Sequence, residues 1–103
     1  MSNSELEKIK EQYIAILEKK LNDLLLSRSS NNNKIQQMQE NFTICGNFLN
    51  DVINKLANEF VDELNSDKFS SVSLEEKEKT NDSFRIKTKE LVLQYNRKFL
   101  LNE

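Results

Sequence analysis

The fold is decided by a central stretch that reads IQQMQENFTICGNFLNDVINKL from Ile35 to Leu56. Its apolar residues alternate between steps of three and four, which is the heptad repeat of a coiled coil. We therefore predict one long helix over residues 34–64, with an apolar seam that faces one or more neighbouring helices. The seam consists of Ile35, Met38, Phe42, Cys45, Leu49, Val52 and Leu56.

Other apolar residues widen this seam. Phe48, Ile53 and Phe60 fall on flanking positions, which suits a bundle of three or four helices better than a two-stranded coil. After Leu56 the next two seam positions are Glu59 and Glu63. The regular heptad is therefore predicted to end near Leu56.

A helix is expected on each side of this stretch. Ser4 followed by Glu7 has the spacing of a capping box, which predicts a first helix over 5–26. The polar run 27–33 then serves as a linker. A second Ser-x-x-Glu pattern after the polar segment 65–73 predicts a third helix over 74–101, which the polar residues 80–83 interrupt.

These elements predict an all-α fold, an elongated helical hairpin or coiled-coil bundle of three helices in a single domain 1–103. The chain has no proline and one glycine, which argues against sheets and tight hairpins. Apolar residues make up 37% of the chain against 31% charged, so a self-sufficient core is doubtful. At roughly 45 Å the central helix should project from any globule, whose radius of gyration would be about 13 Å.

Catalytic and metal chemistry have little to build on. Without a histidine, the commonest general base and zinc ligand is missing. Cys45 falls on the apolar seam, where burial makes a thiol a small hydrophobe rather than a nucleophile. Adjacent carboxylates such as Glu75 and Glu76 point about 100° apart on a helix and do not face each other. We therefore expect no enzyme activity, cofactor or metal, and assign no catalytic, cofactor-binding or metal-binding residue.

Gly46 lies in the middle of the seam helix, where glycine costs about 1 kcal/mol relative to alanine. Two interpretations stay open. Either a neighbouring helix approaches closely at this point, or the glycine is a tolerated bend beside the bulky Phe42 and Phe48.

Charge does not single out a nucleic acid or a membrane as partner. The net charge is −2 with the signs interspersed, so we expect neither nucleic acid nor direct membrane contact. We also expect no small-molecule ligand. Nucleic-acid binding by the segment from Arg85 to Lys98 remains a minor alternative, which predicts a steep salt dependence. The absence of an apolar leader or spanning segment predicts an intracellular protein, cytoplasmic or nuclear.

The expected function is a non-catalytic coiled-coil subunit of a larger helical complex, as a scaffold or tether, with other coiled-coil subunits as partners. Hetero-oligomers are favoured, and the alternative is a homo-oligomeric helical adaptor that presents a peptide- or membrane-binding surface. In general character the chain resembles short coiled-coil subunits of eukaryotic complexes, such as those of kinetochores, vesicle and lysosome positioning or Mediator, although no motif carries the resemblance. The predicted partner interface comprises Ile35, Met38, Phe42, Cys45, Phe48, Leu49, Val52, Leu56, Phe60, Leu91, Tyr95 and Phe99.

Overall fold

The computed structural model describes residues 2–101 and confirms the all-α prediction. The middle of the chain is one continuous helical rod over 34–64, as predicted, but it contains a π-helical turn that nothing in the sequence pattern indicated. A short 3-10 turn follows this rod. The elements are α1 (Ser2–Leu26), α2 (Lys34–Phe48), the π-helical turn (Leu49–Ile53), α3 (Asn54–Leu64), the 3-10 turn (Asp67–Phe69) and α4 (Leu74–Leu101).

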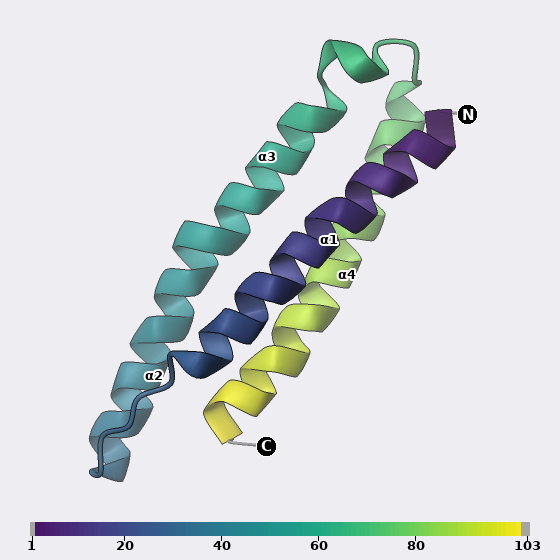
Figure 1. Cartoon of the computed structure of the whole chain (residues 1–103). Coiled ribbons are helices and arrows are strands. Elements are labelled where there is room, and N and C mark those ends of the chain that lie inside the picture. Colours follow the sequence, from purple (N-terminus) through teal and green to yellow (C-terminus); the bar gives the residue numbers. More distant parts are fainter. Residues whose placement is uncertain (1, 102–103) are drawn as a thin grey trace.

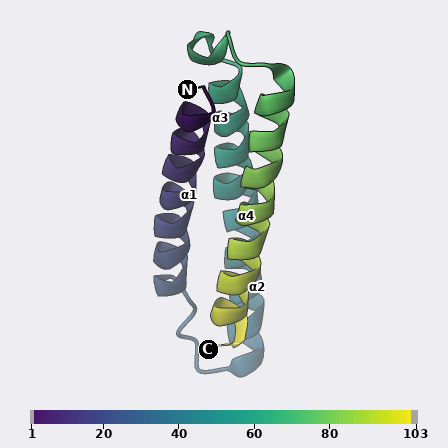
Figure 2. The same ribbon diagram turned by 90° about the vertical axis from the view of Figure 1, so that its right-hand side faces the viewer.

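The three helical rods lie side by side (Figures 1 and 2). Their bundle measures 56 × 21 × 18 Å, with a radius of gyration of 16.4 Å, compared with about 13 Å for a compact chain of this length. The expectation that the central helix projects from a globule is therefore wrong, because the whole chain is a rod. The first turns of α2 extend furthest past the end of α1 in both views.

The packing of α1 agrees only in part with the predicted hairpin. As expected, α1 contacts the following rod 34–64, through α3, but its most extensive contact is with α4. Lys10 on α1 donates a hydrogen bond of 3.0 Å to the Ser83 hydroxyl on α4. The chain therefore closes its bundle between its first and last helices.

The helix ends agree only in part with the capping predictions. Because α1 already begins at Ser2, Ser4 lies inside the helix and does not mark its start. By contrast, α4 begins at Leu74, and the Glu76 amide donates to the Ser73 hydroxyl oxygen at 3.2 Å. The expected break at 80–83 does not occur. There, the Thr80 hydroxyl donates to the Glu76 carbonyl at 2.9 Å, which satisfies it within the helix.

The linker 27–33 is bound along the side of α2 rather than left free. The Asn33 side chain caps α2 by accepting from the Gln36 amide at 3.1 Å. The Ser29 amide donates to the side-chain oxygen of buried Asn41 at 2.8 Å, and the Gln37 side chain donates to the Ser29 carbonyl at 3.2 Å. The polar residues of the linker thus form hydrogen bonds with α2 instead of extending a helix.

The centre of the bundle is a cluster of three aromatic rings, one from each rod. Phe60 on α3, with no exposed surface, lies 5.2 Å from the ring of Tyr13 on α1 and 4.3 Å from the ring of Phe84 on α4, measured between centroids. Aliphatic and aromatic residues extend this core along the rod in both directions. They are Leu6, Ile14, Leu17, Leu21, Leu24, Leu56, Leu64, Phe69, Val72, Leu91 and Phe99.

Phe60→Ala is expected to lower the free energy of unfolding by about 3–5 kcal/mol, because it empties the centre of the core. Phe42→Ala is the matched control, since Phe42 is 59% exposed and its loss should cost less than about 1 kcal/mol. Urea denaturation followed by circular dichroism at 222 nm measures both. Equal losses would contradict the placement of these two residues.

Candidate interaction groove

The predicted seam does not lie on one face of the folded rod. Its first part is exposed, with Ile35 at 71% and Phe42 at 59% of full exposure, and Met38 and Leu49 also exposed. Beyond the π-helical turn the seam turns inward, and Leu56 is buried in the core. The intramolecular face of α2 is instead formed by residues beside the seam, among them the buried Asn41.

The π-helical turn explains this change of face. A π turn holds more residues than an α turn, so the five residues Leu49–Ile53 rotate the rest of the rod about its axis relative to an unbroken α-helix. Leu56 and Phe60 rotate into the core as a result. Leu49 and Ile53 stay outside it and lie at a hollow between the central rod and α4.

We call this hollow the open groove. It consists of two connected parts, of about 240 Å³ and about 680 Å³. Both parts are lined by Leu49, Ile53 and Val92. The smaller part lies between α2, α4 and the end of α1, which contributes Leu21 and Leu24. No residue of α1 lines the larger part, so this side of the bundle has two helical walls and no third.

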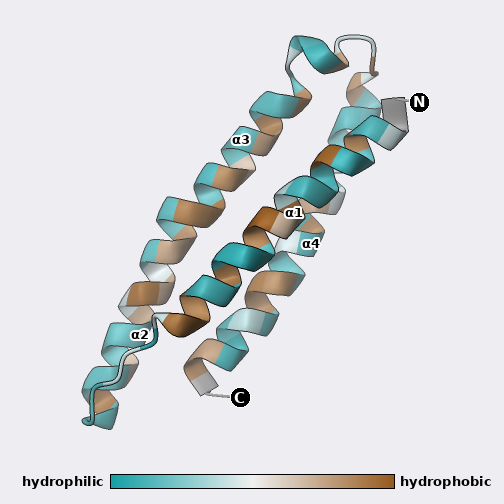
Figure 3. Cartoon of the chain, in the orientation of Figure 1, coloured by the Kyte–Doolittle hydropathy of each residue, from teal (hydrophilic) through white to brown (hydrophobic). Residues whose placement is uncertain are grey.

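The walls of the open groove are largely apolar. From the central rod come Phe42, Leu49, Ile53 and Ala57, and from α4 come Ile86, Val92 and Leu93. Figure 3 shows hydrophobic residues recurring along both rods, in brown, between hydrophilic ones. Ile86 is 62% exposed and Leu93 is 61% exposed, although hydrophobic side chains of this size are usually buried.

Four large hydrophobic side chains that line the open groove are exposed, namely Phe42, Leu49, Ile86 and Leu93. Large apolar side chains left exposed together on a surface mark interaction sites.

The structure divides the twelve predicted interface residues into three groups. Ile35, Met38, Phe42 and Leu49 are exposed and open to a partner. A second group is partly buried against the core: Cys45, Phe48, Val52 and Tyr95. The third group lies inside the chain's own core and is not available to a partner, which corrects the prediction for these residues: Leu56, Phe60, Leu91 and Phe99.

Sequence reasoning missed the α4 wall of the groove. Ile86 and Leu93 are seven residues apart, the same heptad spacing that identified the central seam. That signal was hidden by the many other apolar residues near the end of the chain. Only the packing of α4 separates Leu91, which is buried, from Leu93, which is not.

The two edges of the open groove differ in charge. On α4, Arg85 and Lys89 line the groove together with Asp82. Neither cation forms an ion pair with a carboxylate of the described residues. On the central rod, the groove residues Leu49, Ile53 and Ala57 are each followed by an exposed, uncharged asparagine, namely Asn50, Asn54 and Asn58. The charged residues Asp51, Lys55 and Glu59 line neither part of the groove. Thr88 also lines the groove, and its buried hydroxyl oxygen has no hydrogen-bond partner.

Gly46 lines the smaller part of the groove. A Cβ atom built there would meet no other atom within 4 Å. Close approach by a helix of this same chain therefore does not account for the glycine. If a neighbouring helix is the reason for Gly46, that helix must belong to a second molecule.

Gly46→Ala is expected to raise the free energy of unfolding of the isolated chain by about 0.5–1 kcal/mol, through helix propensity alone. Thermal and urea denaturation of the two proteins measure this gain. A loss of stability would contradict the open space around Gly46.

Cys45 does not lie in the core, which corrects the prediction of a buried seam thiol. It is partly exposed, packs against the core and lines the smaller part of the groove. Burial of this thiol raises its pKa, so less of the reactive thiolate is present at neutral pH.

A disulfide reagent such as Ellman's reagent should therefore label native Cys45 several times more slowly than the urea-unfolded chain at pH 7–8. The unfolded chain's rate divided by the native chain's rate should fall as the pH rises through the pKa values of both forms. Both thiols are then ionised, and only the steric part of the protection remains. A ratio near one at pH 7 would contradict the burial of this thiol.

Within residues 2–101, no group of three or more potential ligands is placed to hold a metal ion. No helix in that range combines the length and apolar character needed to cross a membrane. No family model, no curated protein and no solved structure matches this chain. The open groove is therefore the feature from which a function can be argued.

Proposed function

We propose that this protein is a non-catalytic subunit of a larger helical multi-protein complex, acting as a scaffold or tether. Its open groove receives a helix of another subunit, which completes a four-helix bundle. The single observation that carries this proposal is the apolar groove between the central rod and α4, lined by Leu49, Ile53 and Val92. Bundles of four helices share such a core among all their members.

The packing of the chain supports this role. The three rods already bury one shared core, so the chain can fold before its partner arrives. The exposed seam residues Ile35, Met38 and Phe42 continue the apolar surface along α2. A helix docked in the groove would cover part of that surface without disturbing the aromatic centre at Phe60.

A different protein is favoured over a second copy as the partner. Two copies packed groove to groove would bring two Arg85 and two Lys89 side chains into one interface, against only two Asp82 carboxylates. Like charges at an interface oppose association.

Leu49→Asp is expected to abolish assembly with the partner subunits, because it places a charge at the junction of the two parts of the groove. The isolated chain should stay folded, since Leu49 is 45% exposed. Leu74→Asp is the matched control, because Leu74 is exposed outside the groove and an acidic residue suits a helix start. The measurement is the stoichiometry of the complex purified through the tagged chain.

If Leu49→Asp co-purifies with its partners at the wild-type ratio, the groove is not the interface. Sedimentation velocity of the purified chain addresses the homo-oligomeric adaptor separately. A monomer is expected. A stable dimer or tetramer that Leu49→Asp dissociates would favour the adaptor instead.

A further inference from the structure

We propose that the segment bound in the open groove is an amphipathic α-helix of the partner, with an apolar stripe on one face and acidic residues along the flank beside α4. This inference rests on the proposed function and specifies the chemistry of the partner. It is drawn from the shape of the groove and from the unequal charges of its two edges.

The shape of the groove selects a helix. Its main walls are two helical rods, the central rod and α4, and residues 2–101 contain no sheet edge to which a strand could add. Leu49, Ile53 and Ala57 lie four residues apart along one wall, the kind of row between which the side chains of a neighbouring helix pack. From Gly46 to Ala57 the wall is roughly 17 Å long, enough for about three helical turns.

The smaller part of the groove sets where the partner comes closest. Gly46 presents no side chain there, and the space that a Cβ would occupy is empty. The adjoining walls of Phe42 and Leu49 are apolar. A large apolar side chain of the partner therefore fits at this end, and the helix backbone can approach the rod at Gly46. Small residues at helix crossings permit such close contact.

The charges along the groove indicate which flank of the partner helix carries acidic residues. Arg85 and Lys89 line the α4 edge without ion pairs to described carboxylates, and Asp82 offsets one of the two charges. Nearby Arg97, beside Leu93, adds a further positive charge to this side of α4, and Glu90, beside Ile86, adds a negative one, so the three cations still outnumber the two carboxylates. The opposite edge carries the uncharged Asn50, Asn54 and Asn58. A helix with carboxylates on its α4 flank complements this field, whereas its other flank is not constrained.

Two synthetic helical peptides test this inference. Both carry leucines at heptad positions and differ only in the flanking residues, which are glutamate in one peptide and lysine in the other. Fluorescence anisotropy with the full chain should show that the glutamate peptide binds about tenfold more tightly at low salt. The preference should shrink as salt is raised, since exposed charges are then screened. Binding should also slow the labelling of Cys45, which lines the groove.

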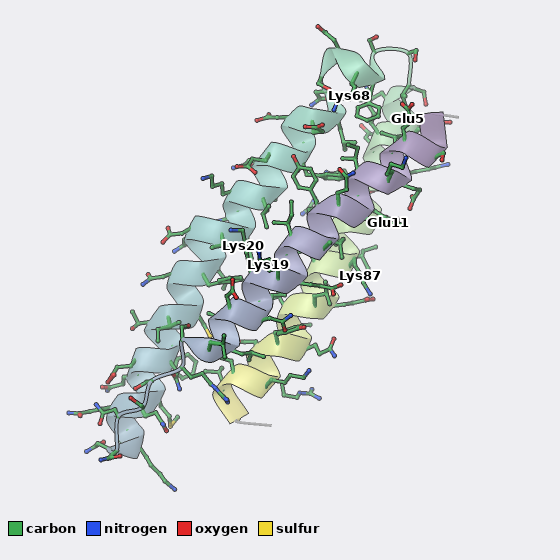
Figure 4. The ribbon with its side chains drawn as sticks, in the orientation of Figure 1. Glu5, Glu11, Lys19, Lys20, Lys68 and Lys87 are labelled. Atoms are coloured by element: carbon green, nitrogen blue, oxygen red, sulfur yellow. The ribbon has the colours of Figure 1, made fainter. Side chains whose placement is uncertain are left out.

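Two charge-reversal variants locate the preference. Lys89→Glu should weaken binding of the glutamate peptide about fivefold and strengthen that of the lysine peptide. Lys87→Glu makes the same change of charge on the same helix, at a residue that lines neither part of the groove (Figure 4). Lys87→Glu should change the ratio of the two affinities by less than twofold.

Equal binding of the two peptides, or equal effects of Lys89→Glu and Lys87→Glu, would overturn the acidic flank. The groove would still stand as the docking site if Leu49→Asp abolishes binding of both. If neither peptide binds, the proposed helical ligand is overturned. The proposed function is tested separately, by whether Leu49→Asp co-purifies with the partner subunits. A dimer of the chain that protects Cys45 without peptide would identify a second copy as the occupant and overturn the inference.

Discussion

The bundle depends on the contact of three aromatic rings, Tyr13, Phe60 and Phe84, each from a different rod. Aromatic residues bury more area than any other core residue and attract one another in tilted and edge-on arrangements. Because each ring touches the other two, none of the rods can slide or rotate without separating the cluster. The positions of α1 and α4 along the central rod follow from this contact.

The π-helical turn has to be understood against that constraint. Phe60 is held in the centre of the bundle. Whether the apolar seam before Leu49 faces the core or the solvent then depends on how far the helix rotates between Leu49 and Phe60. The turn Leu49–Ile53 leaves Ile35, Met38 and Phe42 outside the core. Irregular turns of this kind are frequent at functional sites, and this one lines both parts of the open groove.

The division of the seam explains how the chain can bury a core and still leave apolar residues exposed. The half beyond the π turn supplies the core, while the half before it, together with α4, leaves a groove with two helical walls. Gly46 and the unpaired Thr88 hydroxyl both lie on that groove. Each is a local cost to the isolated chain, and neither is offset by a contact within the described residues.

The sequence alone determined the helical class, the extent of the central and last helices, and the Ser73 cap, because heptad spacing and capping are local properties. It also singled out the exposed residues from Ile35 to Leu49. It could not tell that Leu56 turns inward, that α1 packs chiefly on α4, or that Ile86 and Leu93 face a groove. Those outcomes depend on helix rotation and on which helices meet. Only the tertiary packing around Phe60 decides them, because an apolar stripe specifies burial but not the surface that buries it.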